Sequence, residues 1–176
     1  MTLWNHYHTP GSVDEALDRL QSYAGKARVI AGGTDLLLDI RHGHQPAPDA
    51  LIDITAIPEL CDVTQDGDTL LIGAGVTHAR IVDDPLIAAR ATCLVESCGV
   101  VGGPQVRNVG TLGGNVAHAL PAGDGTTSLV ALDAEAEAVV QGERRWYPIR
   151  ELFLGAGQSL LDPTRDLLIR FRFALA

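Results

Sequence analysis

Val29-Ile-Ala-Gly-Gly-Thr-Asp-Leu-Leu37 leads from one apolar run through a glycine pair into a second apolar run. The first run, Arg28 to Ala31, predicts a short buried strand, and the second, Leu36 to Arg41, predicts a short helix that ends at Gly43. Ala50 to Ile54 then predicts another strand. The opening of the chain is therefore βαβ-like, with a glycine turn where the first strand passes into the helix.

A second glycine turn, Gly110-Thr-Leu-Gly-Gly-Asn115, leads into Val116-Ala-His118. Each turn is expected to gather unpaired amide groups and the positive end of a helix dipole, an arrangement that suits a pyrophosphate. The alternative is that each glycine pair only forms a tight turn, since glycine adopts positive φ angles easily. Neither turn is a known dinucleotide fingerprint alone, and Gly73-Ala-Gly75 and Gly155-Ala-Gly157 lack the third glycine of that pattern.

The remaining elements are predicted from periodicity and from capping and turn residues. Ser12-Val-Asp-Glu15 has the pattern of a capping box and starts a helix that Gly25 ends. Asp66-Gly-Asp68 lies between two apolar runs and predicts a hairpin, and Thr77 predicts a helix start. The other predicted segments are a helix over 85–98, a long ligand-wrapping loop over 99–125, a helix over 128–132, and strands over 135–140, 144–148 and 167–173. The predicted fold class is α+β.

The composition of the 176 residues is that of a globular protein with its own core. Hydrophobic residues make up 46% and charged residues 20%, so we expect one domain or two tightly packed lobes. The net charge of −9 disfavours a nucleic acid or an anionic membrane as partner. The N-terminus lacks the features of a signal peptide, and the three cysteines, which lack metal-site spacing, are expected to be reduced and mostly buried. These features predict a cytoplasmic protein.

Taken together, the two glycine turns and their flanks resemble one particular family. Val29 to Leu37 looks like the first FAD motif, and Gln105 to Asp124 looks like the second, of the FAD-binding medium subunit of molybdenum hydroxylases, the family of xanthine dehydrogenase and aerobic carbon monoxide dehydrogenase. The resemblance covers about residues 4 to 173. It implies a single PCMH-type FAD-binding domain over 1–176, with the α+β fold of the vanillyl-alcohol-oxidase class. A small βαβ-like N-terminal lobe over 1–56 would pack on a larger, mixed and mostly antiparallel lobe over 57–176.

The resemblance also implies a set of cofactor-binding residues. Val29 to Leu36 would hold the pyrophosphate and the adjoining ribose of FAD. Asp124 matches the acidic residue near the flavin end, and Leu168, or its neighbour Leu167, matches an apolar residue close to the ring. The full set is Val29, Ile30, Ala31, Gly32, Gly33, Thr34, Asp35, Leu36, Thr111, Gly113, Gly114, Asn115, Asp124 and Leu168. No catalytic residue of the chain itself is implied.

The function implied is that of an electron-transfer subunit. Electrons would arrive from a two-iron ferredoxin-like subunit, pass through FAD and leave to NAD, oxygen or a quinone-linked acceptor, while a molybdenum-cofactor subunit oxidises the substrate. Two alternatives stay open: a free-standing FAD-dependent oxidoreductase, and a non-catalytic FAD-binding relative. Family members continue into a C-terminal domain, whereas this sequence ends at Leu168-Ile-Arg-Phe-Arg-Phe-Ala-Leu-Ala176. We therefore expect either a trimmed domain or a short relative with a more open flavin.

Other candidate residues are less specific. His6-Tyr-His8 and His42-Gly-His44 invite a metal interpretation, but no further ligand lies at zinc-like spacing, so no metal site is predicted. Arg107 precedes the second glycine turn, where it would either pair with a phosphate or order the loop through a salt bridge. His118 lies inside the second motif and would either approach the cofactor or be a solvated or helix-packing histidine.

Overall fold

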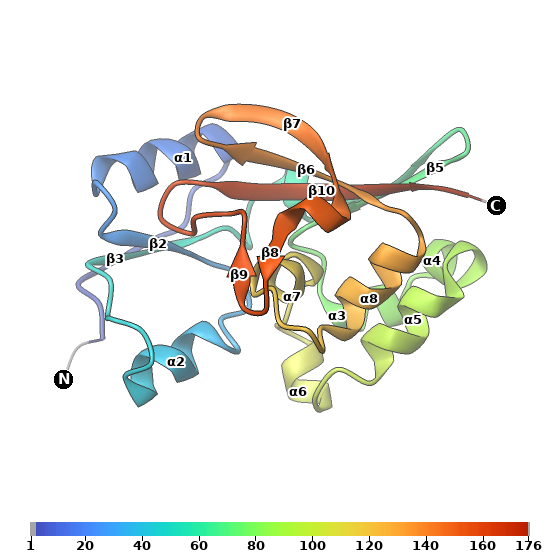
Figure 1. The fold of residues 1–176 in the computed structure, drawn as a ribbon, viewed down its shortest axis with the longest axis horizontal. Helices are drawn as coiled ribbons and strands as arrows, with labels where there is room; N and C mark the ends of the chain where they lie inside the picture. The colour runs from blue at the N-terminus through green and yellow to red at the C-terminus, as the bar shows by residue number, and fades with distance from the viewer. Residues whose placement is uncertain (1–2, 176) are drawn as a thin grey trace.

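The structure is a computed structural model that describes residues 3–175. Figure 1 shows how its elements are arranged along the chain. Their bounds are β1 (His6–His8), α1 (Val13–Ser22), β2 (Ala27–Ile30), α2 (Leu36–His42), β3 (Ala50–Asp53), η1 (Pro58–Leu60), β4 (Val63–Asp66), β5 (Thr69–Gly73), α3 (His78–Asp83), α4 (Pro85–Arg90), α5 (Thr92–Gly99), α6 (Pro104–Arg107), α7 (Leu112–Ala117), α8 (Asp124–Ala131), β6 (Glu135–Val140), β7 (Glu143–Pro148), η2 (Ile149–Leu152), β8 (Phe153–Gly155), β9 (Gln158–Ser159) and β10 (Leu167–Ala174).

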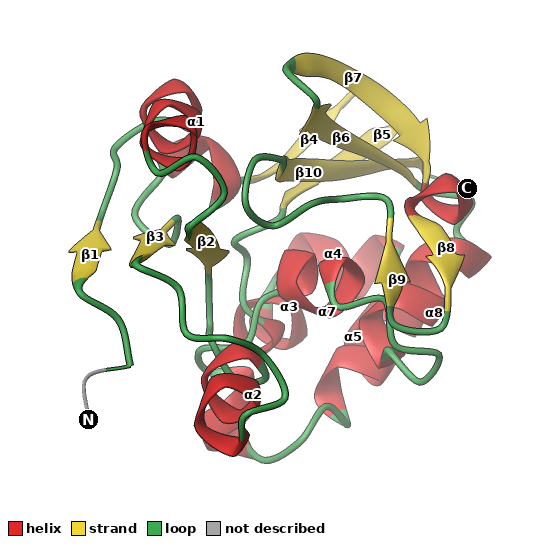
Figure 2. Cartoon of the chain, turned by 60° about the vertical axis from the view of Figure 1, so that its left-hand side comes forward, coloured by secondary structure: helices red, strands yellow, loops and turns green. Residues whose placement is uncertain are grey.

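A three-stranded parallel sheet in the order β1-β3-β2, called here the small sheet, forms the N-terminal part. α1 begins where the Ser12 hydroxyl accepts a hydrogen bond from the Glu15 amide (3.1 Å), and it buries Ala16 and Leu20. α2 ends at Gly43, whose φ of 75° is the left-handed conformation that glycine favours. The two helices lie on opposite sides of the small sheet (Figures 1 and 2). The predicted βαβ opening is therefore confirmed.

A five-stranded antiparallel sheet in the order β4-β5-β10-β6-β7, the large sheet, forms the second layer. β10 is its central strand, and its side chains alternate, with Phe171 and Phe173 buried and Arg170 and Arg172 half-buried. Five helices, α3, α4, α5, α7 and α8, cover one face of this sheet (Figure 1). The hairpin predicted around Gly67 joins β4 to β5 as expected.

The small sheet is not an independent unit, because its core continues into the large sheet. Leu167 and Ile169 of β10 belong to the same buried cluster as Leu20 of α1 and Ile52 of β3. In addition, the Val29 amide donates a hydrogen bond of 2.9 Å to the Pro163 carbonyl. This packing fixes the carboxyl ends of β2 and β3 relative to the large sheet. No helix within residues 3–175 is long and apolar enough to span a bilayer.

Two predictions about the middle of the chain were wrong. The helix expected over 85–98 is broken into α4 and α5 at Ala91, which adopts a non-helical conformation (φ −144°, ψ 56°). The segment expected to be a loop over 99–125 contains α6 and α7 and the start of α8. Pro104 at the first position of α6 and the Thr111 cap of α7 overcome the low helix propensity of the surrounding glycines. The short strands β1, β8 and β9 were not predicted.

Candidate functional site

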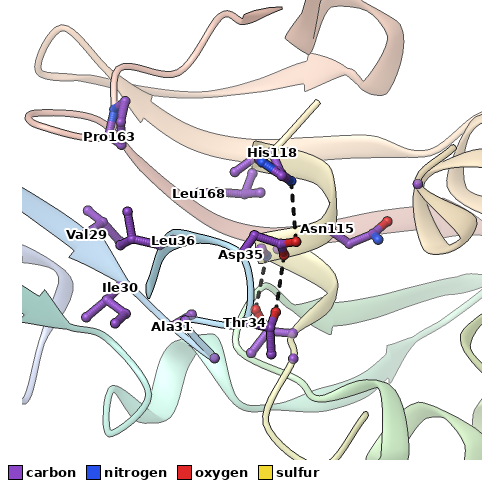
Figure 3. A pocket seen from close by; sticks show the side chains of 18 of the residues that line it. Val29, Ile30, Ala31, Thr34, Asp35, Leu36, Asn115, His118, Pro163 and Leu168 are labelled. Carbon is purple, nitrogen blue, oxygen red and sulfur yellow. Dashed lines mark hydrogen bonds and ion pairs between the residues drawn. The ribbon is translucent and has the colours of Figure 1, made fainter. Parts of the chain in front are cut away.

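Both glycine turns line one cavity of about 640 Å³ between the small sheet and α7. Its size lies in the range of small-molecule and cofactor sites. Figure 3 shows Val29, Ile30 and Leu36 on one side of it and His118 and Leu168 on another. The cavity brings together every predicted cofactor-binding residue, namely Val29, Ile30, Ala31, Gly32, Gly33, Thr34, Asp35, Leu36, Thr111, Gly113, Gly114, Asn115, Asp124 and Leu168. Leu167 lines it as well.

The first glycine turn offers free hydrogen-bond donors. Among the hydrogen bonds of residues 3–175, none is donated by the amides of the four consecutive residues from Gly32 to Asp35. The four residues follow the carboxyl end of β2 and line the cavity, where an anion could satisfy such amides. The expectation of unpaired amides is therefore confirmed for this turn.

The second glycine turn differs, because its amides are already used. Leu112 and Gly113 donate to the carbonyls of Val76 and Ala74 at 2.9 and 2.8 Å, and Gly114 donates to the Thr111 hydroxyl at 3.0 Å. These bonds anchor the turn to the connection between β5 and α3. The expectation of unpaired amides was wrong for these positions. The dipole argument is weak at both turns, since α2 and α7 have only 7 and 6 residues.

Each of the four glycine positions in the two turns has a different structural environment. A Cβ on Gly32 would lie 2.1 Å from the Val109 carbonyl oxygen, so Gly32 lets the two turns meet backbone to backbone. Gly33 has a φ of 67°, and a Cβ there would lie 3.0 Å from Ile30 Cδ1. A Cβ on Gly113 would lie 2.6 Å from the Ala74 side chain. At Gly114, by contrast, the nearest atom would be the Thr111 hydroxyl at 3.1 Å.

Gly114 is therefore the glycine whose missing side chain leaves room on the cavity side. It is exposed, whereas Gly113 is buried. The next residue, Asn115, turns its carboxamide oxygen to α8, where it accepts from the amide and the hydroxyl of Thr126, both at 3.0 Å. This leaves the Asn115 NH2 group as a donor without a partner among residues 3–175. The second wall thus presents an exposed glycine without a side chain and a side-chain donor in place of backbone amides.

One ion pair links the two walls. Asp35 precedes α2 but makes no capping hydrogen bond, and its carboxylate instead accepts from the Thr34 hydroxyl at 3.2 Å. Its other oxygen lies 3.9 Å from Nδ1 of His118, which follows the last residue of α7 (Figure 3). Both side chains line the cavity.

A buried histidine beside the second turn was missed by sequence reasoning. His78 is 2% exposed, lines the cavity, and lies with Nδ1 at 3.3 Å from the Cys98 sulfur. Its amide donates to the Gly110 carbonyl at 3.0 Å, which attaches α3 to the turn. Burial lowers the pKa of His78 despite the nearby Asp124 carboxylate, and burial raises the pKa of the Cys98 thiol to about 12. The helix start predicted at Thr77, one residue earlier, was the available signal.

The other candidates lie outside the cavity. Arg107 donates to the carbonyls of Val101 and Gly102 at 3.2 and 2.9 Å. Of its two alternative roles it therefore fills the one of ordering the loop, but through hydrogen bonds to the backbone in place of a salt bridge. His8 Nε2 lies 2.8 Å from the Tyr23 hydroxyl. Within the described part of the chain, no group of three or more potential ligands could hold a metal ion. Cys98 is buried but Cys93 is exposed, so the expectation of mostly buried thiols was wrong.

The chain resembles known proteins in family, sequence and structure. The profile of the FAD binding domain in molybdopterin dehydrogenase matches residues 3–173. The carbon monoxide dehydrogenase medium chain of Hydrogenophaga pseudoflava is 38% identical over 170 residues, which cover 94% of this chain and 57% of the relative. The nicotinate dehydrogenase FAD-subunit of Eubacterium barkeri is 34% identical over 152 residues, covering 86% of this chain and 51% of the relative.

Solved structures give the same result. Carbon monoxide dehydrogenase from Hydrogenophaga pseudoflava superimposes with a TM-score of 0.91 at 33% identity, covering 97% of this chain and 59% of that one. Quinoline 2-oxidoreductase from Pseudomonas putida 86 superimposes with a TM-score of 0.90 at 29% identity, again over 97% and 59%. The chain therefore spans a little over half the length of these relatives.

Proposed function

The chain belongs to the family of FAD-binding domains of molybdopterin dehydrogenases, with FAD as cofactor, and on that premise we propose that it is the electron-transfer module of a molybdenum-hydroxylase-like complex. It would receive electrons from a two-iron ferredoxin-like partner and pass them to an acceptor, while a molybdenum-cofactor subunit oxidises the substrate. The names of the relatives, a medium chain and an FAD-subunit of dehydrogenases, support this role. We place the protein in the cytoplasm, because that compartment keeps thiols reduced and the three cysteines are free.

The cavity carries the proposal, because its residues fit FAD. Free amides at the first turn suit a diphosphate, and the open side of Gly114 leaves room for it. We assign Val29 to Leu36 to the diphosphate and adjoining ribose, and Thr111, Gly113, Gly114 and Asn115 to the facing wall. Gly113 contributes shape only, since its amide is bound to Ala74. Asp124 and Leu168 are assigned to the flavin end. In this scheme 1–56 and 57–176 are the two lobes of one PCMH-type domain.

The chemistry divides between cofactor and protein. FAD, when bound, takes up and releases electrons, and the protein supplies position and electrostatics. Leu168 and Leu167 are 6% and 2% exposed, so they exclude water from the part of the cavity that they line. The titratable groups buried in or beside the cavity are already engaged: Asp166 accepts from the amides of Gln141 and Asp162, both at 2.8 Å, and His78 faces Cys98. This chain therefore binds and orients, and we assign it no catalytic acid or base.

The test is the flavin content of the purified chain. We expect one FAD per chain, released by acid. In stopped-flow experiments without oxygen, a ferredoxin-like partner that dithionite has reduced should in turn reduce this FAD. FMN in place of FAD, or no flavin after reconstitution, would contradict the assignment of the cavity. Steady turnover of a small substrate by the isolated chain would support a free-standing oxidoreductase instead.

A further inference from the structure

The cavity is unusually acidic for a site that holds a diphosphate. Four carboxylates line it, and its one guanidinium, among residues 3–175, is that of Arg28. The remaining titratable side chains of the lining are two imidazoles. The complete set is Arg28, Asp35, Asp39, His78, His118, Asp124 and Asp166. Because the chain as a whole carries a net charge of −9, its overall field also opposes a ligand with two negative charges.

The charge of Arg28 is already compensated. Its guanidinium donates to the Gln45 carboxamide, which in turn donates to Asp39 at 3.1 Å. The carboxylates of Asp39 and Asp162 both act on it electrostatically. Asp166, at 3% exposure, is satisfied by two backbone amides. Near the glycine turns this leaves the Asp35 carboxylate beside any bound diphosphate, while the Asp124 carboxylate lines the part of the cavity assigned to the flavin end.

Of the two imidazoles, only one is placed to add positive charge there. His78 is buried, and burial lowers its pKa, so it stays neutral at pH 7. His118 has a side chain 33% exposed, and its Nδ1 lies 3.9 Å from an oxygen of Asp35. The His118 amide donates to the Gly114 carbonyl at 3.0 Å, so it stands one helical turn after the glycine that opens to the cavity. It therefore joins the two walls between which the diphosphate would lie.

We propose that His118 is the proton-binding residue of the cofactor site, so that FAD binding is coupled to the uptake of a proton from solvent by the His118 imidazole. This inference rests on the proposed FAD function. A diphosphate beside Asp35 adds negative charge at 118, and an imidazolium there neutralises Asp35 and attracts the phosphates. The single chemical event is protonation: one ring nitrogen of the neutral imidazole takes a proton from a solvent or buffer donor and forms an N–H bond, which gives imidazolium.

The measurement is isothermal titration of the FAD-free full chain with FAD at pH 7, in two buffers of different ionisation enthalpy. The difference in observed heat gives the number of protons taken up per FAD. We expect a substantial fraction of one proton for the wild type. FAD affinity should weaken by about tenfold between pH 5.5 and pH 8.5. A change in affinity of this size corresponds to the loss of one partly solvated charge pair.

Variants identify the residue responsible. His118→Asn keeps a hydrogen-bonding group near Nδ1 without a charge, and should abolish proton uptake and the pH dependence of affinity. His118→Lys should bind FAD at pH 8.5 as tightly as the wild type does at pH 5.5. His42→Asn removes an exposed imidazole outside the cavity and should behave as wild type. Thermal unfolding of each FAD-free variant verifies that it is folded.

The outcomes separate this inference from the proposed function. Proton uptake that is lost in His118→Asn supports it. FAD binding without proton uptake, or uptake that persists in His118→Asn, overturns it while the FAD site stands. A wild-type chain that binds no FAD overturns the proposed function and this inference with it.

Discussion

Replacing Gly32 with alanine is expected to destabilise the protein even when no cofactor is bound. The new Cβ would lie 2.1 Å from the Val109 carbonyl oxygen, 2.6 Å from its carbon and 2.8 Å from Gly110 Cα. Cβ atoms in folded proteins essentially never come closer than 3.0 Å to such an atom, and the first of these distances is nearly 1 Å below that limit. All three atoms are backbone, so no side chain can rotate away, and one of the two turns has to move.

The cost follows from that geometry. Overpacking a well-packed interior costs about 1 to 3 kcal/mol, and a clash with backbone belongs at the upper end, about 3 kcal/mol. For a chain of this size this corresponds to a loss in Tm of roughly 6 to 12 °C. The matched control is Gly114→Ala, the same added methyl group in the facing turn. Its nearest contact is one hydroxyl at 3.1 Å. Alanine also gains up to about 1 kcal/mol in helix propensity there, so its Tm should stay within roughly 4 °C of wild type.

The assay is thermal unfolding of the FAD-free proteins, followed by circular dichroism and repeated at several urea concentrations. Unfolding of Gly32→Ala within roughly 2 °C of wild type would contradict the predicted clash with the backbone. An equal loss of Tm in Gly114→Ala would contradict it too, because the effect would then follow from the loss of any glycine and not from the contact with Val109.

Three further changes test other parts of the structure. Gly114→Val should leave the apoprotein folded, with Tm within roughly 4 °C of wild type, and abolish FAD binding in a fluorescence titration; normal affinity would show that Gly114 does not face the cofactor. The pKa of His78 is lowered below its ordinary 6.5 by burial, so the unfolded state binds the proton more readily. Its contribution to stability should be complete above pH 6.5 and decline as the pH falls below it, and this part of the urea-measured pH profile should vanish in His78→Gln. Burial alone would raise the pKa of Glu137, but hydrogen bonds from Arg144 and Arg170 (2.9 and 2.7 Å) lower it below 4.5. Glu137→Gln should cost about 1 to 2 kcal/mol at pH 7 and progressively less as the pH falls below 4.5; a cost independent of pH would show that the charge plays no part.

The sequence was most informative where short-range rules act alone. The Ser12 cap, the left-handed Gly43 and the Gly67 hairpin each depend on neighbouring residues, and each was predicted correctly. The glycine turns were found, but their four glycines could not be told apart. Gly32 and Gly113 are glycines because of Val109 and Ala74, residues tens of positions away in the chain. Only tertiary structure shows such contacts.

The same limit applies to the rest of the site. The amides of the second turn looked available because their acceptors, Val76 and Ala74, belong to a different segment. No sequence pattern marked His78 as a residue of the site, because a single histidine at a helix start can have many roles. Its burial against Cys98 depends on how α3 and α5 pack, which the sequence does not show. Asp124 and Leu168 were predicted to belong to the site from the family resemblance and not from the spacing of residues in the sequence.

The position of β10 has a consequence for how the protein matures. The last strand of the described chain lies in the middle of the large sheet, between β5 and β6, so until it is inserted β4–β5 and β6–β7 remain separate hairpins. Leu167 and Leu168, at its start, also line the cavity. During synthesis both glycine turns leave the ribosome well before this strand does, yet they have no finished cavity to face. We therefore expect FAD to bind only after translation of this region is complete, so that a pool of colourless precursor precedes the flavoprotein.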